Sequence, residues 1–243
     1  MRLTTDLIRD SLSYLNPLKE RELDLRGHRI PAIENLGVAG AHDAIDFTDN
    51  DIQVLGNFPL SPRISTLLLA RNRVVTIQNT LATSIPNLKN LVLSSNNLTE
   101  LADLDPLGKF SHLTHLVLAD NPVAKKENYR YWVLWLCPTV RFLDYVKVKQ
   151  AERERGTELF GTLEEPTPLA VEIMGQKSTA TAISVNGSAA PSKLSRMKLT
   201  DAEKKRLQEK IRNATTLEEI TALSKELNEG RLPSGIQADA MEE

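Results

Sequence analysis

The sequence has little of several features that mark common protein classes. It contains one cysteine, Cys137, among 243 residues, so no disulfide can form within the chain and a reducing compartment is favoured. Aromatic residues make up 5% of the chain and the net charge is −2, so composition favours neither nucleic acid nor an anionic membrane as a partner. No apolar run approaches the ~20 residues of a membrane-spanning helix, and the first twenty residues lack the apolar segment of a signal peptide. Composition therefore predicts a soluble intracellular protein.

The signatures of catalysis are also missing. The sequence has no nucleophile motif and no glycine-rich phosphate loop. Its four histidines do not have the spacing of metal ligands. We therefore expect a binding protein rather than an enzyme, without a metal or a cofactor.

A short phrase recurs in the first half of the chain. Each copy has two apolar residues separated by one position and followed by an asparagine, as in residues 67–72. The asparagines recur every 22 to 25 residues, at Asn50, Asn72, Asn96 and Asn121, and an upstream copy has His28 in their position. This spacing is typical of leucine-rich repeats. It predicts an α/β fold, a leucine-rich-repeat solenoid in which successive strands stack as a parallel sheet on the concave side.

The repeat register separates the core positions of each strand from the positions that it displays. The two apolar residues of each phrase point inward, so the residues between and beside them face out of the concave sheet. The central displayed column is predicted to be Asp24, Asp46, Leu68, Val92 and Val117. One flanking column begins with Glu22, and the other contains Arg26, Thr48, Ala70 and Ser94. These ten residues are our candidate contacts for a protein partner.

The central column changes from acidic to apolar along the solenoid. Asp24 and Asp46 would lie on adjacent strands, roughly 5 Å apart, where two carboxylates repel by ~3 kcal/mol at an effective dielectric near 20. We therefore expect a partner that brings Lys or Arg to Asp24 and Asp46 and apolar side chains to the other end. Paired carboxylates can also serve acid–base catalysis, but no pocket or nucleophile accompanies them in the sequence.

A solenoid needs a polar-faced element at each end. Residues 4–16 have apolar residues at helical spacing after Thr4 and Thr5 and predict a helical N-terminal cap. After the repeats, at about 20–128, residues 129–136 predict a helix that stops before Pro138. A short strand at 142–144 follows, and the charged segment from Lys147 to Phe160 is predicted to be helical. We predict one repeat domain with its caps over residues 1–160.

The remaining residues differ in composition from the repeats. Residues 161–196 are rich in Pro, Gly, Ser, Thr and Ala without an apolar period and predict a flexible linker. Two capping boxes, Thr200 with Glu203 and Thr216 with Glu219, predict a two-helix segment over 197–232 whose apolar stripe docks on another protein. Residues 233–243 are predicted to be a disordered tail.

Basic residues gather near the C-terminal cap. They are Lys125, Lys126, Arg130, Lys147, Lys149 and Arg153. They could contact the phosphate backbone of RNA, a contact that positions the protein without reading sequence. They could equally form a solvated helix face, because glutamates are interleaved with them. Charge alone leaves these two interpretations open.

Several phrases resemble a known family, the A-prime proteins of the U2 small nuclear ribonucleoprotein. The most specific are Arg-Glu-Leu-Asp-Leu-Arg-Gly at 21–27, Ile-Pro-x-Ile-Glu-Asn-Leu-Gly at 30–37 and Val-Arg-x-Leu-Asp at 140–144. In the tail, Ile-Arg-Asn-Ala-Thr-Thr-Leu-Glu-Glu at 211–219 and Gly-Arg-Leu-Pro at 230–233 continue the match. The resemblance covers residues 1–160 and about 197–234, whereas positions 61–66 and 78–85 match no motif of the family.

This resemblance implies a non-enzymatic scaffold subunit of the U2 particle that acts in pre-mRNA splicing in the nucleus. Its concave face would bind an RNA-recognition-motif protein of the B-double-prime type and support the binding of that protein to a stem-loop of U2 small nuclear RNA. Other spliceosomal proteins would bind the C-terminal helices, and no membrane is involved. The alternative is a leucine-rich-repeat scaffold of the phosphatase-regulatory or ciliary type, which would bind a folded protein partner and need no basic cap.

Overall fold

The computed structural model describes residues 2–176, which belong to one compact unit. The predicted two-helix segment at 197–232, the tail at 233–243 and most of the predicted linker lie outside the described residues.

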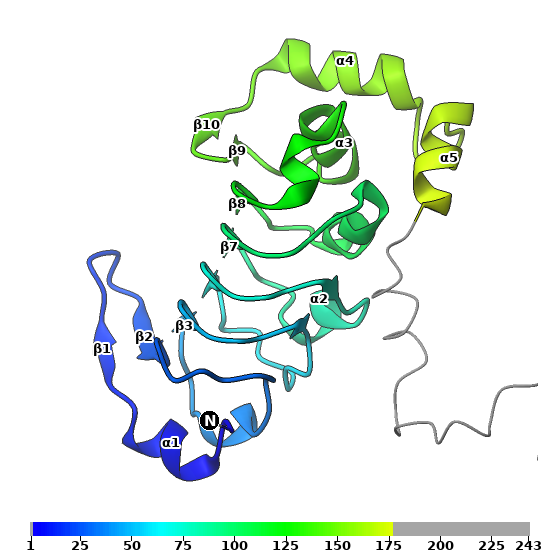
Figure 1. Ribbon diagram of the computed structural model, residues 1–243. Helices are drawn as coiled ribbons and strands as arrows, with labels where there is room; N and C mark the ends of the chain where they lie inside the picture. The colour runs from blue at the N-terminus through cyan, green and yellow to red at the C-terminus, as the bar shows by residue number, and fades with distance from the viewer. Residues whose placement is uncertain (1, 177–243) are drawn as a thin grey trace, which may run out of the picture. The chain divides into compact units, whose positions relative to one another are not determined.

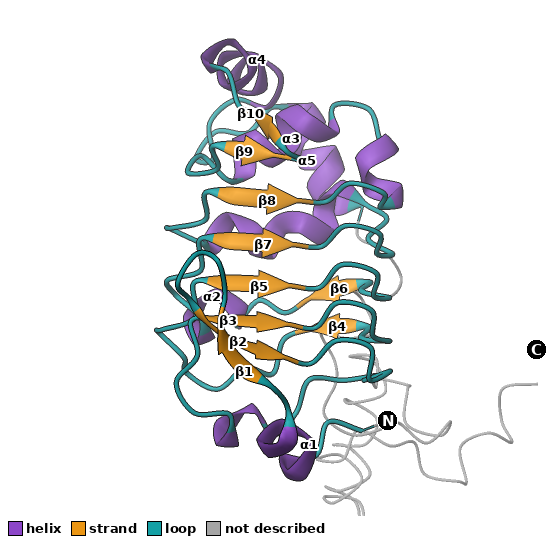
Figure 2. Cartoon of the chain, turned by 90° about the vertical axis from the view of Figure 1, so that its left-hand side faces the viewer, coloured by secondary structure: helices purple, strands orange, loops and turns teal. Residues whose placement is uncertain are grey.

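An eight-stranded sheet runs the length of the described unit (Figure 2). Its order along the sheet is β1 (Ser13–Leu15), β2 (Arg21–Asp24), β3 (Ala44–Asp46), β5 (Thr66–Leu68), β7 (Asn90–Val92), β8 (His115–Val117), β9 (Phe142–Leu143) and β10 (Val146–Lys147). The pairs from β2 to β9 are parallel, whereas the β1–β2 and β9–β10 pairs at the two ends are antiparallel. This ladder confirms the predicted repeat fold.

The helical segments are α1 (Thr5–Asp10), η1 (Leu36–Val38), α2 (Leu81–Ser84), η2 (Leu101–Lys109), η3 (Pro122–Lys125), α3 (Tyr129–Leu136), α4 (Gln150–Phe160) and α5 (Pro168–Gly175), and a small second sheet pairs β4 (Val54–Leu55) with β6 (Thr76–Ile77). In Figure 1, α2, α3 and α5 lie on the side of the repeats away from the main sheet, whereas α1 and α4 lie at the two ends. The helices within the repeats are short because a repeat of 22 to 25 residues leaves little chain after its strand and turns. Within residues 2–176 none of the helices has both the length and the apolar character to cross a membrane.

The asparagine of each repeat joins that repeat to the one before it. The Asn72 amide nitrogen donates to the carbonyl of Phe47 in the preceding repeat at 2.8 Å and to that of Leu69 in its own repeat at 3.2 Å. Its amide oxygen accepts from the Ile52 backbone N–H at 3.1 Å. The same three kinds of bond recur at Asn50, Asn96 and Asn121. All four side chains are buried, so the asparagines satisfy turn groups that water cannot reach.

The N-terminal cap differs from its prediction. The predicted helix ends early, at Asp10, and Thr4 caps its start by accepting from the Leu7 N–H at 3.2 Å. The chain then forms β1, which pairs with β2, because the Asn16 side-chain oxygen accepts from the backbone N–H groups of Leu18 and Glu20 and closes a turn. The prediction of a helix through residue 16 was therefore wrong beyond Asp10.

The C-terminal cap packs around aromatic side chains. Trp132 on α3 contacts Phe160 on α4 edge-to-face, with ring centroids 5.0 Å apart, and Trp135 lies 5.0 Å from Trp132. Helix α3 ends at Leu136, before Pro138, as predicted. The short strand predicted after it is β9. The charged segment predicted as a helix from Lys147 is helical only from Gln150, as α4, because Lys147 belongs to β10.

The structure also differs from the predicted linker at its start. Residues 161–176 belong to the described unit and contain α5, whose Ala170 is fully buried. Thr167 caps this helix by accepting from the Ala170 N–H at 3.3 Å, and Pro168 occupies its first position. Proline is well suited to that position because its missing N–H would be unsatisfied there in any case. Composition predicted a linker here because the same proline lies in a segment rich in Gly, Ser, Thr and Ala.

Candidate functional site

The strand register brings the predicted central column together. Asp24 pairs with Asp46, Asp46 with Leu68, Leu68 with Val92, and Val92 with Val117. The inward positions on either side of this column, such as Leu67 and Leu69, are fully buried. The five central residues therefore form one row across five adjacent strands on the sheet face.

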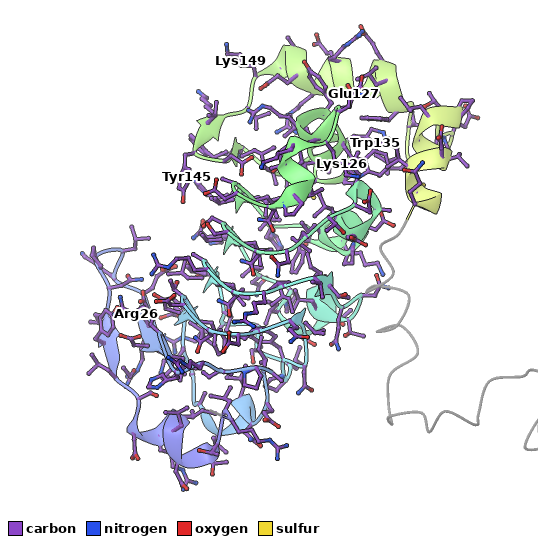
Figure 3. The ribbon with its side chains drawn as sticks, in the orientation of Figure 1. Arg26, Lys126, Glu127, Trp135, Tyr145 and Lys149 are labelled. Atoms are coloured by element: carbon purple, nitrogen blue, oxygen red, sulfur yellow. The ribbon has the colours of Figure 1, made fainter. Side chains whose placement is uncertain are left out.

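Arg26 supplies the positive charge that the two aspartates need. Its guanidinium donates to both Asp24 carboxylate oxygens, at 2.9 and 2.6 Å, and its Nε lies 3.6 Å from an Asp46 oxygen. Hydrogen bonding from Arg26 lowers the pKa of the Asp24 carboxyl below its ordinary value, and the same contact raises the pKa of Arg26. Figure 3 shows Arg26 on the sheet side of the molecule. Arg26 thus balances one of the two carboxylates within the chain, so the repulsion that led us to expect a cationic partner group is already reduced.

Several predicted contact residues are less exposed than the strand pattern implied. Asp46 and Val117 are each 6% exposed, whereas Leu68 and Val92 remain half-buried. Thr48, Ala70 and Ser94 are also half-buried. Since these three side chains are small, they leave a shallow lane beside the apolar part of the central row.

Glu22 is used within the chain. It is 6% exposed, and its carboxylate accepts from the Tyr14 hydroxyl at 2.7 Å and the Asn16 amide at 2.9 Å. Hydrogen bonding to Glu22 raises the pKa of Tyr14. The neighbouring Glu20 carboxylate accepts from the hydroxyls of Ser65 and Thr66 at 2.9 and 2.8 Å. These bonds fasten the β1–β2 hairpin to strand β5, two strands away.

Exposed apolar side chains lie on the hairpins at both ends of the sheet. Leu15 and Leu18 on the β1–β2 hairpin are each 72% exposed, and Tyr145 on the β9–β10 hairpin is 76% exposed. Figure 1 shows the two hairpins at opposite ends of the sheet, and Figure 3 shows Tyr145 on the sheet side. Phe142 stacks on His115 at 4.8 Å and extends the apolar surface onto β9. These residues were not predicted, because the sequence pattern did not indicate a hairpin at either end of the sheet.

The predicted basic cluster divides into two groups. Lys126 pairs with Glu100 at 2.8 Å, Arg130 pairs with Glu152 at 2.6 Å, and Arg153 donates to the Val140 carbonyl. Within the described residues, Lys125, Lys147 and Lys149 are exposed and form no ion pair. Figure 3 shows Lys126 and Lys149 at separate places on the molecule. The six residues therefore do not form a single patch.

The site contains no arrangement suited to metal chemistry in the part of the chain that the structure describes. No group of three His, Cys, Asp or Glu side chains there is placed to hold a metal ion. Cys137 is buried in the C-terminal cap, and burial raises the pKa of its thiol to about 12. At neutral pH this cysteine is a neutral core side chain and not a thiolate ligand or nucleophile.

The parallel ladder, the buried asparagines and the capped ends define a leucine-rich-repeat protein, and a family model described as "Leucine-rich repeat" matches residues 1–173. The chain is 71% identical to the U2 small nuclear ribonucleoprotein A′ of Neurospora crassa over 100% of both chains. It is 38% identical to the Homo sapiens protein of that name, over 96% of this chain and 90% of the relative. The chain therefore belongs to the U2 small nuclear ribonucleoprotein A′ family.

A solved structure supports the same assignment. The crystal structure of the Drosophila melanogaster SNF/U2A′ complex contains a chain that is 46% identical to this one, with a TM-score of 0.65, over 68% of this chain and 95% of that chain. The family membership confirms the resemblance found in the sequence and identifies the chain as a leucine-rich-repeat protein of the spliceosomal U2 particle. It favours this family over the phosphatase-regulatory and ciliary scaffolds.

Proposed function

We propose that this chain is a non-enzymatic scaffold subunit that acts in the nucleus in pre-mRNA splicing. Its sheet face binds an RNA-recognition-motif protein of the B-double-prime type and supports the binding of that protein to a stem-loop of U2 small nuclear RNA. The observation that carries the proposal is a sheet face with an apolar row, a lane of small residues and an apolar hairpin at each end. The complex of a similar chain with SNF supports a protein partner at such a chain.

The geometry of the face suits a helix of the partner. Leu68 and Val92 supply apolar contact surface at the centre, and Ala70 and Ser94 beside them let a partner backbone approach closely. An amphipathic helix that lies along such a groove buries the side chains of one face against it. Asp24 and Arg26 lie at the N-terminal end of the row and are both accessible, so polar partner side chains can bond to that ion pair.

The RNA contact that we propose for this chain is limited to the phosphate backbone. Lys147 and Lys149 are exposed near the start of α4, with Lys125 at the end of η3. Lysine at such positions attracts phosphate without selecting a base. The partner reads the bases, because RNA-recognition motifs stack unpaired bases on their sheet.

A charge placed at the centre of the row tests the protein interface. We expect Leu68→Glu to weaken binding of the purified RNA-recognition-motif subunit at least 10-fold in isothermal titration calorimetry, because the new carboxylate would lose its hydration in the interface. The control is Leu60→Glu, since Leu60 is 75% exposed in a loop outside the sheet. Circular dichroism would confirm that both variants fold. Wild-type affinity of the folded Leu68→Glu variant would refute the proposed interface.

Recovery of RNA distinguishes this proposal from the other scaffold types. We expect the tagged chain to recover U2 RNA from nuclear extract, and we expect this recovery to fall when the RNA-recognition-motif subunit is depleted. A phosphatase-regulatory or ciliary scaffold would recover a folded enzyme or motor without U2 RNA.

A further inference from the structure

We infer that a basic cavity at the edge of the sheet where β7, β8 and β9 begin binds a backbone phosphate of RNA. The cavity has a volume of about 390 Å³, and the residues that give it its chemistry are Lys89, Ser111, His112, Arg141 and Arg153. Only Arg153 belongs to the basic cluster described above. The inference rests on the proposed function and adds a second phosphate contact to it.

The repeat period places two of these cations on either side of the cavity. Lys89 immediately precedes β7, Thr114 immediately precedes β8, and Arg141 immediately precedes β9. The backbone bonds between them confirm this alignment, because the Thr114 N–H donates to the Lys89 carbonyl at 2.9 Å and the Arg141 N–H donates to the Thr114 carbonyl at 2.8 Å. Lys89 and Arg141 are therefore two strands apart, a backbone separation of roughly 10 Å. Their long side chains can reach one anion from opposite sides.

Arg153 also lines the cavity, and its guanidinium is held in place. One of its terminal nitrogens, Nη2, donates to the Val140 carbonyl and fixes the guanidinium in place. The other, Nη1, is buried and has no hydrogen-bond partner among the described residues. Arg153 therefore places a fixed positive charge beside the cavity, and a guanidinium group attracts phosphate strongly.

The charge in this cavity is not balanced by carboxylates. No Asp or Glu lines it, and across residues 2–176 neither Lys89 nor Arg141 forms an ion pair. At the opposite edge of the sheet, by contrast, Arg71 pairs with Asp49 at 3.4 Å and Arg73 pairs with Asp51 at 3.0 Å. The cavity therefore has the charge that an anion site needs, whereas the opposite edge does not.

Continuity with the exposed lysines just before α4 favours RNA over a phosphorylated peptide as the source of the phosphate. The Val148 N–H donates to the Arg141 carbonyl at 2.8 Å, so Lys147 and Lys149 lie on the segment that adjoins the cavity. Arg153 follows Lys149 by about one helical turn. A polynucleotide presents a series of phosphates to such a row, whereas a phosphopeptide would present one.

The test measures RNA affinity as a function of salt concentration. The double variant Lys89→Ala/Arg141→Ala is compared with Arg9→Ala/Lys109→Ala, which removes the same charge from exposed positions on α1 and η2. Full-length chain is assembled with the RNA-recognition-motif subunit, and binding to the U2 RNA stem-loop is measured from 50 to 200 mM salt. Formation of the protein pair is measured separately, without RNA. If the pair does not form, the same RNA is titrated against the chain alone.

We expect Lys89→Ala/Arg141→Ala to weaken RNA binding about 3- to 10-fold and to reduce the slope of log affinity against log salt by about 1, the value for one lost phosphate contact. The variant should form the protein pair as the wild type does. If the wild type itself does not form the pair, that result counts against the proposed function and not against this site. The site is overturned if both double variants bind RNA equally well. It is also overturned if Lys89→Ala/Arg141→Ala weakens binding of a phosphoserine peptide but leaves RNA affinity and its salt slope unchanged.

Discussion

At the scale of single residues, the buried asparagines show how one side chain can serve two repeats. Each amide donates to carbonyls of both repeats and accepts from a backbone N–H of the earlier one. No other short side chain carries a donor and an acceptor on the same planar group. The residue therefore recurs because the turn needs an amide, and its period can be read directly from the sequence.

The neighbouring pair Asn96 and Asn97 allows this role to be measured. Asn96→Ala would leave the Val74 N–H without its partner and would remove one of the two amide donors to the Leu69 carbonyl, the other being Asn72. A buried unsatisfied group costs roughly 1–3 kcal/mol. We expect urea denaturation to give a loss of about 2–4 kcal/mol in the free energy of unfolding. Asn97 is exposed, and Asn97→Ala should change that value by less than about 0.5 kcal/mol. Equal losses in the two variants would contradict the bridging role.

At the scale of secondary-structure elements, the two caps are built differently. The N-terminal cap combines α1 with a hairpin that polar side chains fasten to the sheet. The C-terminal cap covers the last repeat with α3 and α4, which meet through Trp132, Trp135 and Phe160. Phe160 is fully buried at the end of α4, so its ring holds α4 against α3 together with the Arg130–Glu152 ion pair.

Removal of that ring should loosen the C-terminal cap. We expect Phe160→Ala to lower the free energy of unfolding by about 3–5 kcal/mol, as is usual when a buried aromatic is truncated. Near-ultraviolet circular dichroism should also change, because the indole rings lose their asymmetric neighbour. Leu163→Ala is the control, since Leu163 is 60% exposed and its truncation should leave both measurements unchanged. If Phe160→Ala also leaves both measurements unchanged, Phe160 does not stabilise the cap.

The elements also show which parts of the fold and the candidate site sequence reasoning can predict. Periodic features succeeded, because the leucine spacing and the asparagine period determine the strands and their register. Predictions were wrong where a single side chain favours a different local structure from the one that the surrounding pattern indicates. Asn16 closes a turn where apolar spacing predicted a longer helix, and Pro168 starts a helix where composition predicted a linker. Arg26 was assigned to a separate displayed column, and only the folded geometry places its guanidinium on both Asp24 and Asp46.

At the scale of the whole molecule, the candidate interface runs from one hairpin to the other. Its centre is supplied by the repeats, whereas its most exposed apolar residues belong to the ends. A partner that spans the sheet would contact both hairpins, so the two ends would contribute to one binding event from distant positions.

Substitutions at the two hairpins should therefore act independently. We expect Leu18→Ala and Tyr145→Ala each to weaken binding of the RNA-recognition-motif subunit about 3- to 10-fold, and their effects on binding free energy should add, as is usual for distant sites without shared contacts. Surface plasmon resonance on the two single variants and the double variant measures this. Val38→Ala, on η1, is the control because Val38 is 41% exposed and lies outside the sheet. If only one hairpin substitution weakens binding, the partner covers only that end of the sheet.

The antiparallel strands at the two ends of the ladder have a consequence for solubility. A parallel ladder that stopped at β2 or β9 would present a row of unpaired N–H and C=O groups, to which the end of another copy could add. Instead β1 has three residues and β10 has two, and one of the two β10 residues is Lys147. Short outer strands are poor templates for further pairing, and the charge of Lys147 weakens pairing further at β10. Each hairpin thus disfavours end-to-end strand pairing between copies of the chain, which would otherwise extend the repeat sheet into a fibre.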